Sequence, residues 1–252
     1  MRFDKGRQLS MNSYSVRIPK RIHQTWRDLN VRGHSLLAER SQESWIKNHP
    51  NWEYRLWTDE ELEPFVEEHY SWFMPTWSSL NLNIKRIDAV RYCWLHKLGG
   101  MYADLDFVAL KCVEPLLVDI DVGSYRSREA ETKNWSFAGN AWMASVPEHP
   151  IWIKMLEHIR DYPEPDEDDM FSVLRHTGPM GLGTVIEAFI KDNDSSRVSV
   201  FNSSLIGNEN EPPVEFAFHA RTQQWGDDWQ GLAKAQPKRS IMRRVRDRIL
   251  NG

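Results

Sequence analysis

Apolar and polar positions in the first part of the chain alternate between the period of a strand and the period of a helix. The pattern predicts a strand in 17–26, a helix in 34–48 and a second strand in 52–57. Thr58 is a favourable N-cap and is followed by acidic residues, so a second helix is expected to begin there. Strands and helices therefore alternate from the start.

The next segment predicts one helix followed by a buried strand. Residues 83–98 carry apolar side chains at 87, 90, 94 and 98, which form one helical stripe. Gly99 and Gly100 are expected to end this helix. Residues 101–110 are apolar enough to form a central strand of a sheet. The order strand, helix, strand, helix, helix, strand predicts the α/β class with a nucleotide-binding type of sheet.

The signals become less regular after residue 110. Segment 134–150 is expected to contain a loop, a short strand and a turn, and 150–161 a helix. The acidic run 163–169 is interpreted as a solvated loop. Residues 178–190 begin with glycines and end as a helix, and 196–201 form a short strand.

The chain is expected to divide into a polar lead-in of residues 1–16, one α/β domain of residues 17–235 and a basic amphipathic helix of residues 236–252. This last segment combines a cluster of Lys and Arg side chains with an apolar helical face. It either packs on the domain with its charges in solvent or lies on an anionic membrane surface.

Composition limits the classes of partner and the cellular locations that are expected. A net charge of -4 gives no general basic field, so nucleic acid is not an expected partner. Two cysteines, Cys93 and Cys112, cannot build a disulfide framework, and the N-terminus has no secretory signal pattern. No apolar run has the length of a membrane-spanning helix. The expected location is cytoplasmic, with peripheral membrane contact as a further hypothesis.

Asp104 and Asp106 are the main chemical signal, since charged side chains seldom lie in an apolar run unless they are paired or bind a metal. In a continuous strand, residues i and i+2 point to the same side, so both carboxylates could reach one ion. Carboxylates suit Mg²⁺ or Mn²⁺ bound together with a diphosphate. For an isolated Asp-X-Asp, a solvated strand end is the more common explanation.

Neighbouring residues favour the metal interpretation. Asp88 and Arg91 are three residues apart and share one helix face, where they could form a surface ion pair or hold a nucleotide. Tyr102 precedes Asp104 by two residues and is expected on the same side, although a core role is the ordinary alternative. Phosphatases of the haloacid-dehalogenase type also use an Asp-X-Asp, but Phe107 and Val108 follow here and the motif is not near the N-terminus.

Five sequence blocks occur in a fixed order: RIPKRIHQTW, NHPNWEYRLWTDEE, RIDAVRYCWLHKLGGMYADLDFVAL, GNAWMASVPEHPIW and HTGPMGL. Together they resemble the DXD-containing sugar transferases of glycosyltransferase family 32, over about residues 17–225. That family includes fungal initiating α-1,6-mannosyltransferases, inositol-phosphoceramide mannosyltransferases and bacterial polysaccharide enzymes, and clostridial glucosylating toxins are similar at a distance. The resemblance implies a GT-A fold, a nucleotide-sugar donor and retention of anomeric configuration.

The resemblance also implies roles for individual residues. Asp104 and Asp106 match the DXD that binds Mn²⁺ or Mg²⁺ with the donor diphosphate. His219 matches a histidine near the end of the family's catalytic domain and is the expected third metal ligand, with a phosphate ligand or a structural histidine as the alternatives. The family's Ser-Trp that follows is only half matched, because Gln224 precedes Trp225.

Other positions are expected around the donor. Asp88 and Arg91 match the helix pair that touches the donor sugar and ribose, and Arg91 would stabilise charge on the leaving phosphate. Trp26 matches an aromatic that stacks on the base, with a packed core role as the alternative. Asn140 matches a polar position near the donor sugar, and Tyr102 is placed in the same donor site.

Three adjacent residues stay ambiguous at this point. His176 is a weaker alternative to His219 as a ligand. Thr177 and Gly178 either shape the acceptor side or form the turn that leads into a helix.

The sequence thus predicts a metal-dependent retaining hexosyltransferase. It would move a hexose from GDP-mannose or a UDP-hexose to a glycan or lipid-linked glycan, by front-face substitution in which the leaving phosphate takes the acceptor proton. The alternative is a GT-A module that binds a nucleotide-sugar or glycan without turnover.

Overall fold

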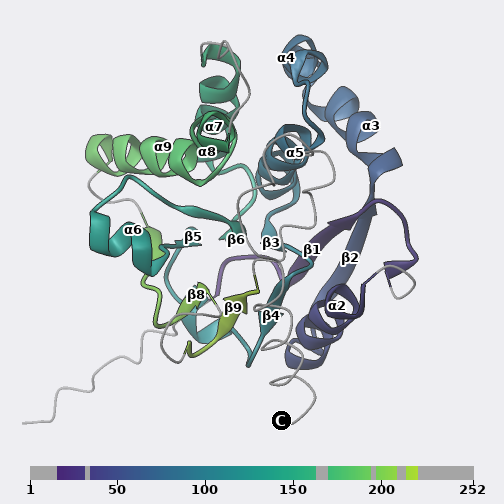
Figure 1. Cartoon of the computed structure of the whole chain (residues 1–252), viewed down its shortest axis with the longest axis vertical. Coiled ribbons are helices and arrows are strands. Elements are labelled where there is room, and N and C mark those ends of the chain that lie inside the picture. The colour runs from purple at the N-terminus through teal and green to yellow at the C-terminus, as the bar shows by residue number, and fades with distance from the viewer. Residues whose placement is uncertain (1–15, 32–34, 163–169, 194–196, 209–213, 221–252) are drawn as a thin grey trace, which may run out of the picture.

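A six-stranded mixed sheet divides the molecule into two layers (Figure 1). The computed structural model describes residues 16–31, 35–162, 170–193, 197–208 and 214–220. Most helices pack on one face of the sheet, while α2 (Leu36–Asn48) and a small three-stranded sheet cover the other face (Figure 1). The predicted α/β class is confirmed.

The large sheet has the order β2-β1-β3-β6-β5-β7. Strand β1 is parallel to β2 and β3, whereas β6 is antiparallel to both of its neighbours. The strands are β1 (Arg21–Trp26), β2 (Glu53–Thr58), β3 (Gly100–Ala103), β5 (Val122–Tyr125), β6 (Gly139–Ser145) and β7 (Val198–Phe201). The carboxyl ends of β1 and β3 and the amino end of β6 therefore meet at one edge.

The single strand predicted for 101–110 is wrong, because the chain changes sheet at the two aspartates. Strand β3 ends at Ala103, and β4 (Phe107–Ala109) belongs to the small sheet, where it pairs with β9 (Ala217–His219). The third strand there is β8 (Ile206–Asn208). The Phe107 N–H donates to the Asp104 carbonyl at 2.9 Å and closes a tight turn. Apolar flanks on both sides hide this turn from period-two analysis.

The predicted helices are confirmed within the described residues. They are α2 (Leu36–Asn48), α3 (Asp59–His69), α5 (Asn83–Leu98), α7 (Pro150–Asp161) and α9 (Pro179–Asp192). Thr58 precedes α3 as expected, and its backbone N–H donates to the Glu61 carboxylate at 2.8 Å. Shorter helical segments not expected from the pattern are η1 (Ser71–Phe73), α4 (Met74–Ser79), η2 (Glu114–Leu117), α6 (Arg128–Lys133) and α8 (Met170–His176).

Helix α5 ends at a pair of glycines in the left-handed region, as the sequence predicts. Gly99 has φ +62° and Gly100 has φ +94°. A Cβ on Gly100 would lie 2.6 Å from the carbonyl oxygen of Arg21, which no real Cβ contact tolerates. The glycines therefore let the chain reverse from α5 directly into β3.

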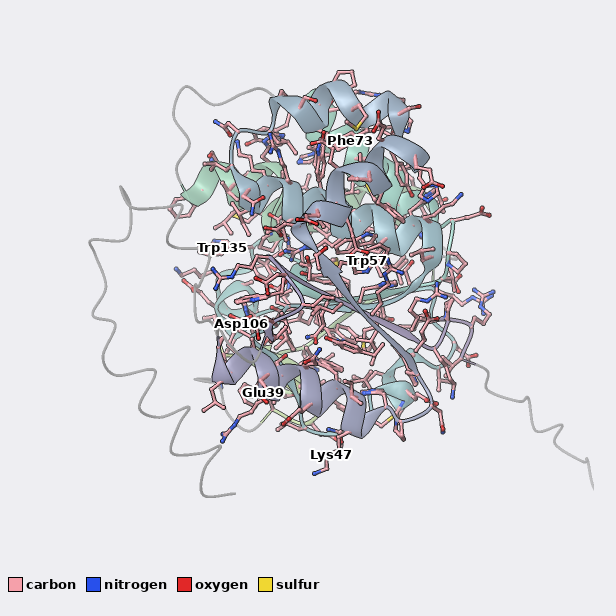
Figure 2. The ribbon with its side chains drawn as sticks, turned by 90° about the vertical axis from the view of Figure 1, so that its right-hand side faces the viewer. Glu39, Lys47, Trp57, Phe73, Asp106 and Trp135 are labelled. Atoms are coloured by element: carbon pink, nitrogen blue, oxygen red, sulfur yellow. The ribbon has the colours of Figure 1, made fainter. Side chains whose placement is uncertain are left out.

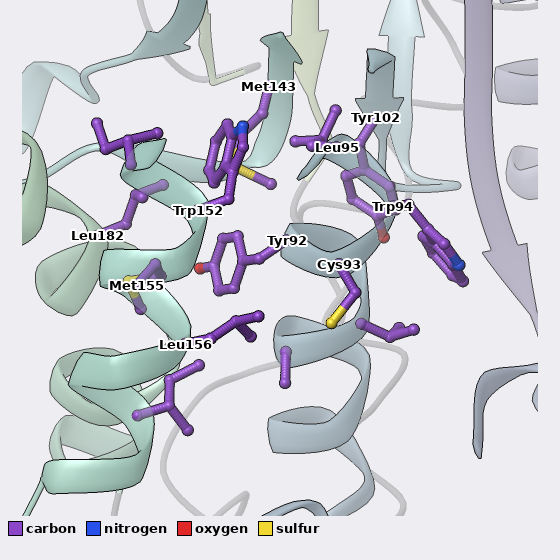
Figure 3. Close-up of a cluster of buried hydrophobic side chains, with 14 of the residues drawn as sticks. Tyr92, Cys93, Trp94, Leu95, Tyr102, Met143, Trp152, Met155, Leu156 and Leu182 are labelled. Atoms are coloured by element: carbon purple, nitrogen blue, oxygen red, sulfur yellow. The ribbon is translucent and has the colours of Figure 1, made fainter. Parts of the chain in front are cut away.

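Aromatic side chains of α5 anchor this helix to the sheet and to α7. Tyr92, Trp94 and Leu95 are fully buried, and Tyr92 stacks on Trp152 of α7 with ring centroids 5.7 Å apart (Figure 3). Trp94 stacks in turn on Tyr102 of β3 at 6.2 Å. This packing fixes the rotation of α5, and with it the polar side chains that α5 presents to the sheet edge. Much of the tryptophan content thus serves the core.

The predicted lead-in, the acidic loop 163–169 and the basic C-terminal segment 236–252 fall wholly or mostly outside the described residues. The division into segments stays a prediction. Among the helices that the structure does describe, none is long and apolar enough to cross a membrane.

Candidate active site

The turn between β3 and β4 brings two carboxylates and an imidazole together. Ligand atoms of Asp104, Asp106 and His219 all lie within 4.8 Å of one another. His219 reaches the turn because β9 pairs with β4 in the register that sets Phe107 opposite His219. The His219 Nε2 atom lies 2.9 Å from an Asp106 oxygen. Two carboxylates suit Mn²⁺ or Mg²⁺, and the imidazole favours Mn²⁺, because Mg²⁺ prefers oxygen ligands, so the donor set fits Mn²⁺ best.

His176, the weaker alternative ligand, lies elsewhere. Its side chain is buried at the end of α8, where Nε2 lies 2.8 Å from the carbonyl oxygen of Ile159. Its ring stacks on Tyr162 with centroids 5.0 Å apart. His176 therefore contributes to the packing of α8 against α7 and is not part of the Asp104–Asp106–His219 group.

Arg91 is a buried cation that connects α5 to the turn. Its guanidinium lies 3.3 Å from Asp104 and 3.3 Å from Asp88, and it donates to the Asn140 carbonyl at 2.8 Å. The guanidinium also lies over the ring of Tyr102, 4.6 Å from the centroid. Only 2% of the residue is exposed, so Arg91 holds a fixed positive charge directly behind the aspartates.

Asp88 is held by three partners, from its own helix α5, from β6 and from the turn before α9. The Asn140 amide of β6 donates to one carboxylate oxygen at 2.9 Å, and the Thr177 hydroxyl donates to the other at 2.9 Å. Arg91 is the third partner. Burial raises the pKa of Asp88 to about 6, while Arg91 and the two hydrogen bonds act in the opposite direction. The predicted pair Asp88–Arg91 is thus a buried unit and not a surface ion pair.

Tyr102 reaches Asp104 as the sequence predicts. Its hydroxyl donates to the Asp104 carboxylate at 2.6 Å. Burial raises the pKa of Asp104, Arg91 acts to lower it, and Asp106 raises it further. Because the Asp106 carboxylate adds to the effect of burial on the pKa of Asp104, a bound cation would relieve the repulsion between these two carboxylates.

Trp26 lies at the carboxyl end of β1, beside the turn. It packs against a small cluster that includes Leu105, the residue between the two aspartates. The ring is partly exposed and the Arg27 guanidinium lies 5.9 Å from its centroid. The indole N–H is buried and makes no hydrogen bond with the described residues. Trp26 is therefore a half-buried aromatic at the edge of the site and not a fully packed core residue.

The contacts also place residues that the sequence left ambiguous, Thr177 and Gly178, and residues to which it gave no role in the site. Thr177 joins the Asp88 network, so the acceptor-side interpretation of this residue finds no support in its contacts. Tyr92 donates to the Thr177 carbonyl at 2.7 Å. Gly178 is the N-cap of α9, which agrees with the expectation of a turn that leads into a helix. Gln24 and Ser41 contact the main chain of the turn, and of these only Gln24 belongs to a block that the sequence singled out.

A DXD turn at the carboxyl end of a central strand, under a mixed sheet with helices on both faces, defines the GT-A type of glycosyltransferase fold. A solved structure described as PaToxG glycosyltransferase shares this fold, with a TM-score of 0.52 and 17% identity over 69% of this chain and 70% of that one. Residues 37–125 match the family described as glycosyltransferase sugar-binding region containing DXD motif. This match confirms the resemblance over that part of the chain.

Curated relatives from fungi extend the match. Inositol phosphoceramide mannosyltransferase 1 of Schizosaccharomyces pombe is 31% identical over 85% of this chain and 63% of its own length. Inositol phosphoceramide mannosyltransferase 3 of the same yeast is 32% identical over 73% of this chain and 49% of its own length. The initiation-specific alpha-1,6-mannosyltransferase of Saccharomyces cerevisiae is 29% identical over 38% of this chain and 21% of its own length. The chain thus spans less than two thirds of each.

Proposed function

We propose that the protein is a metal-dependent retaining glycosyltransferase that moves a hexose from a nucleotide-sugar donor to a glycolipid or glycan acceptor. The observation that carries this proposal is the group Asp104, Asp106 and His219, set against the buried guanidinium of Arg91. Catalytic transfer of a sugar needs charge stabilisation at the departing diphosphate, and the site concentrates groups that provide it.

The donor site follows from the positions of the side chains. Asp104, Asp106 and His219 would hold Mn²⁺ or Mg²⁺. When bound, the ion acts as a Lewis acid on the diphosphate. Arg91 adds a fixed positive charge 3.3 Å from the Asp104 carboxylate, and Trp26 offers a ring at the carboxyl end of β1 on which a base can stack. Tyr102 orients the Asp104 carboxylate through its 2.6 Å hydrogen bond.

Retention of configuration is proposed to proceed on one face of the sugar. Asp88 accepts hydrogen bonds from Asn140 and Thr177 and pairs with Arg91, so it is poorly suited to attack an anomeric carbon. In a front-face substitution the bond from the anomeric carbon to the phosphate oxygen breaks as the acceptor oxygen attaches. The leaving phosphate takes the acceptor proton. Mass spectrometric detection of a glycosyl group on Asp88 would exclude this route.

The names of the relatives support mannose as the transferred sugar and an inositol-containing sphingolipid as the acceptor class. The corresponding donor is GDP-mannose, and the UDP-hexoses are the comparison set. Incubation of the protein with each labelled donor, detergent-solubilised lipid acceptor and Mn²⁺ tests both assignments. Label in the lipid fraction from GDP-mannose alone supports the mannosyl assignment, whereas label from a UDP-hexose alone replaces it.

Location is proposed to be cytoplasmic with peripheral contact to a membrane surface, since a lipid acceptor resides there. The basic segment 236–252, which lies outside the described residues, is the proposed contact. Flotation with anionic vesicles, using the full chain and a form that lacks 236–252, tests this contact. Equal flotation of the two forms removes it from the proposal.

Binding itself is tested by thermal unfolding in the presence of GDP or UDP, each with and without Mn²⁺. A ligand at about 100 times its Kd stabilises a fold by roughly 2.7 kcal/mol. For a domain of this size that corresponds to a shift of several degrees, at roughly 2–4 °C per kcal/mol. A shift with one base that requires Mn²⁺ supports the donor site. No shift with either nucleotide counts against it.

A further inference from the structure

Helix α2 presents a polar face to β4, the strand that leaves the DXD turn. The residues on this face recur at i, i+3, i+4 and i+7: Ser41, Ser44, Trp45 and Asn48. Figure 2 shows α2 along the lower side of the molecule with Asp106 just above it. Glu39 and Lys47, labelled in the same view, lie on the same helix and are not part of this face.

Each of these four side chains bonds to the main chain of β4. Ser41 and Trp45 both donate to the Phe107 carbonyl, at 2.6 Å and 2.7 Å. The Ala109 N–H donates to the Ser44 hydroxyl at 2.9 Å, and Asn48 donates to the Ala109 carbonyl at 3.3 Å. Since the other edge of β4 pairs with β9, the helix side chains take the place of a neighbouring strand.

Gln24 of β1 extends this support to the first aspartate. Its side-chain amide donates to the Asp104 carbonyl at 3.2 Å and to the Ser41 hydroxyl at 3.2 Å. Its side-chain oxygen accepts a hydrogen bond from the Tyr54 hydroxyl at 2.8 Å. Gln24 and Ser41 are both fully buried. The Tyr54 hydroxyl, the Ser41 hydroxyl and the Asp104 carbonyl together fix the orientation of the Gln24 amide. The amide in turn fixes the orientation of the Asp104 peptide group.

The two carbonyls that these side chains hold bracket the turn. The Asp104 carbonyl accepts from Gln24 and from the Phe107 N–H, and the Phe107 carbonyl accepts from Ser41 and Trp45. One peptide unit separates each aspartate from Leu105, so any rotation of the Asp104 peptide changes the spacing of the two carboxylates. A metal site tolerates only small changes of that spacing.

We propose that Gln24 and Ser41 are positioning residues that set the metal affinity of the DXD turn by holding its main chain from behind. This inference rests on the proposed metal-dependent function. Neither side chain needs to touch the ion. Groups that orient metal ligands typically change metal affinity by about 10–100-fold when they are removed.

The test compares three variants of the full chain. Gln24→Met keeps the length of the side chain but removes its amide, and Ser41→Ala removes the hydroxyl. Ser44→Ala is the matched control, because it removes a hydrogen bond of the same helix face to the far end of β4. Mn²⁺ binding is titrated by electron paramagnetic resonance, with Mn²⁺ alone and with GDP or UDP, and thermal unfolding is recorded for each variant.

We expect Gln24→Met and Ser41→Ala to weaken Mn²⁺ binding by about tenfold or more. Ser44→Ala should lower the unfolding temperature to a similar extent yet keep the Mn²⁺ affinity within about twofold of wild type. If folded Gln24→Met and Ser41→Ala both bind Mn²⁺ as tightly as wild type does, the positioning role is overturned, while the proposed metal-dependent function still stands. Absence of Mn²⁺ binding by the wild-type protein overturns the proposed metal function and this inference with it.

Discussion

Arg91 is the residue on which the charge balance of the site depends most. It is the cation between two carboxylates, Asp88 and Asp104, and its own side chain is buried away from water. Removing one partner of a buried charge group leaves the others uncompensated, and this costs more than the group contributes when it is intact. Arg91 is therefore expected to matter for stability as well as for transfer.

Replacing Arg91 with Leu should lower the free energy of unfolding by about 3–5 kcal/mol, because Asp88 and Asp104 lose their cation. Urea denaturation near neutral pH measures this change. Lys97→Ala, at the exposed end of the same helix, is the control and should change stability by less than about 0.5 kcal/mol. A similar loss of unfolding free energy in both variants would show that Arg91 does not balance the buried carboxylates.

His23 provides a prediction for pH. Its Nε2 lies 2.9 Å from the Gly99 carbonyl, and its Nδ1 accepts from the Trp57 indole at 3.1 Å, so the neutral ring fits both bonds. Burial lowers the pKa of His23 from 6.5 to about 4. Between these values the unfolded chain binds a proton and the folded chain does not. The His23 contribution to stability is therefore fully present above pH 6.5 and is lost as pH falls towards 4.

The expected loss is about 3 kcal/mol over that interval, at roughly 1.36 kcal/mol for each pKa unit. Stability is measured by urea denaturation at several pH values for wild type and for His23→Asn, which does not titrate. The variant starts less stable, and the difference between the two proteins should shrink as pH falls from 6.5 to 4. Parallel curves would contradict the neutral buried imidazole.

At the scale of elements, the reversal from α5 into β3 depends on Gly100. Gly100→Ala combines a positive φ with a Cβ placed against the Arg21 backbone, so backbone must move. We expect a loss of at least about 1–3 kcal/mol in the free energy of unfolding. Gly123→Ala is the control, because its tightest contacts are side-chain atoms at 3.2–3.3 Å that can shift. The control should retain more stability than Gly100→Ala in the same denaturation assay.

Periodicity predicted elements well and predicted their junctions poorly. The stripe of α5 and the alternation in β2 are local signals, and both elements form where expected. The turn at Asp104–Asp106 has no local signal, because apolar residues flank it on both sides and the change of sheet is decided by β6 and β9. The two aspartates thus share a site because they lie on one tight turn, and not because a continuous strand points them to the same side.

The same distinction applies to the site residues. The resemblance placed Asp88, Arg91 and Asn140 around the donor, and the structure brings the three residues into contact with one another. Their motifs are contiguous blocks of sequence, which is why the sequence could single them out. Gln24 and Ser41 act through bonds to main-chain carbonyls, which leave no characteristic residue type at the partner position. Such contacts depend on how β1 and α2 pack together and become visible only in the folded chain.

At the scale of the whole molecule, the site is assembled from segments distant in sequence. Strand β1 supplies Trp26, α5 supplies Arg91, the β3–β4 turn supplies the aspartates and β9 returns late in the chain with His219. The two apolar clusters on either face of the sheet hold these segments in place. Metal and donor binding should therefore stabilise the domain as one unit.

The most direct test of the account is turnover of GDP-mannose and of UDP-hexoses with Mn²⁺ or with EDTA, in the presence of an inositol sphingolipid acceptor. Nucleoside diphosphate release and lipid product are followed by mass spectrometry for wild type and Asp106→Asn. We predict consumption of one donor, dependent on Mn²⁺, and a loss of about a hundredfold or more in the variant with little change in unfolding temperature. Turnover that persists in EDTA, or that Asp106→Asn retains in full, would contradict the metal site, and failure of every donor would contradict the transferase itself.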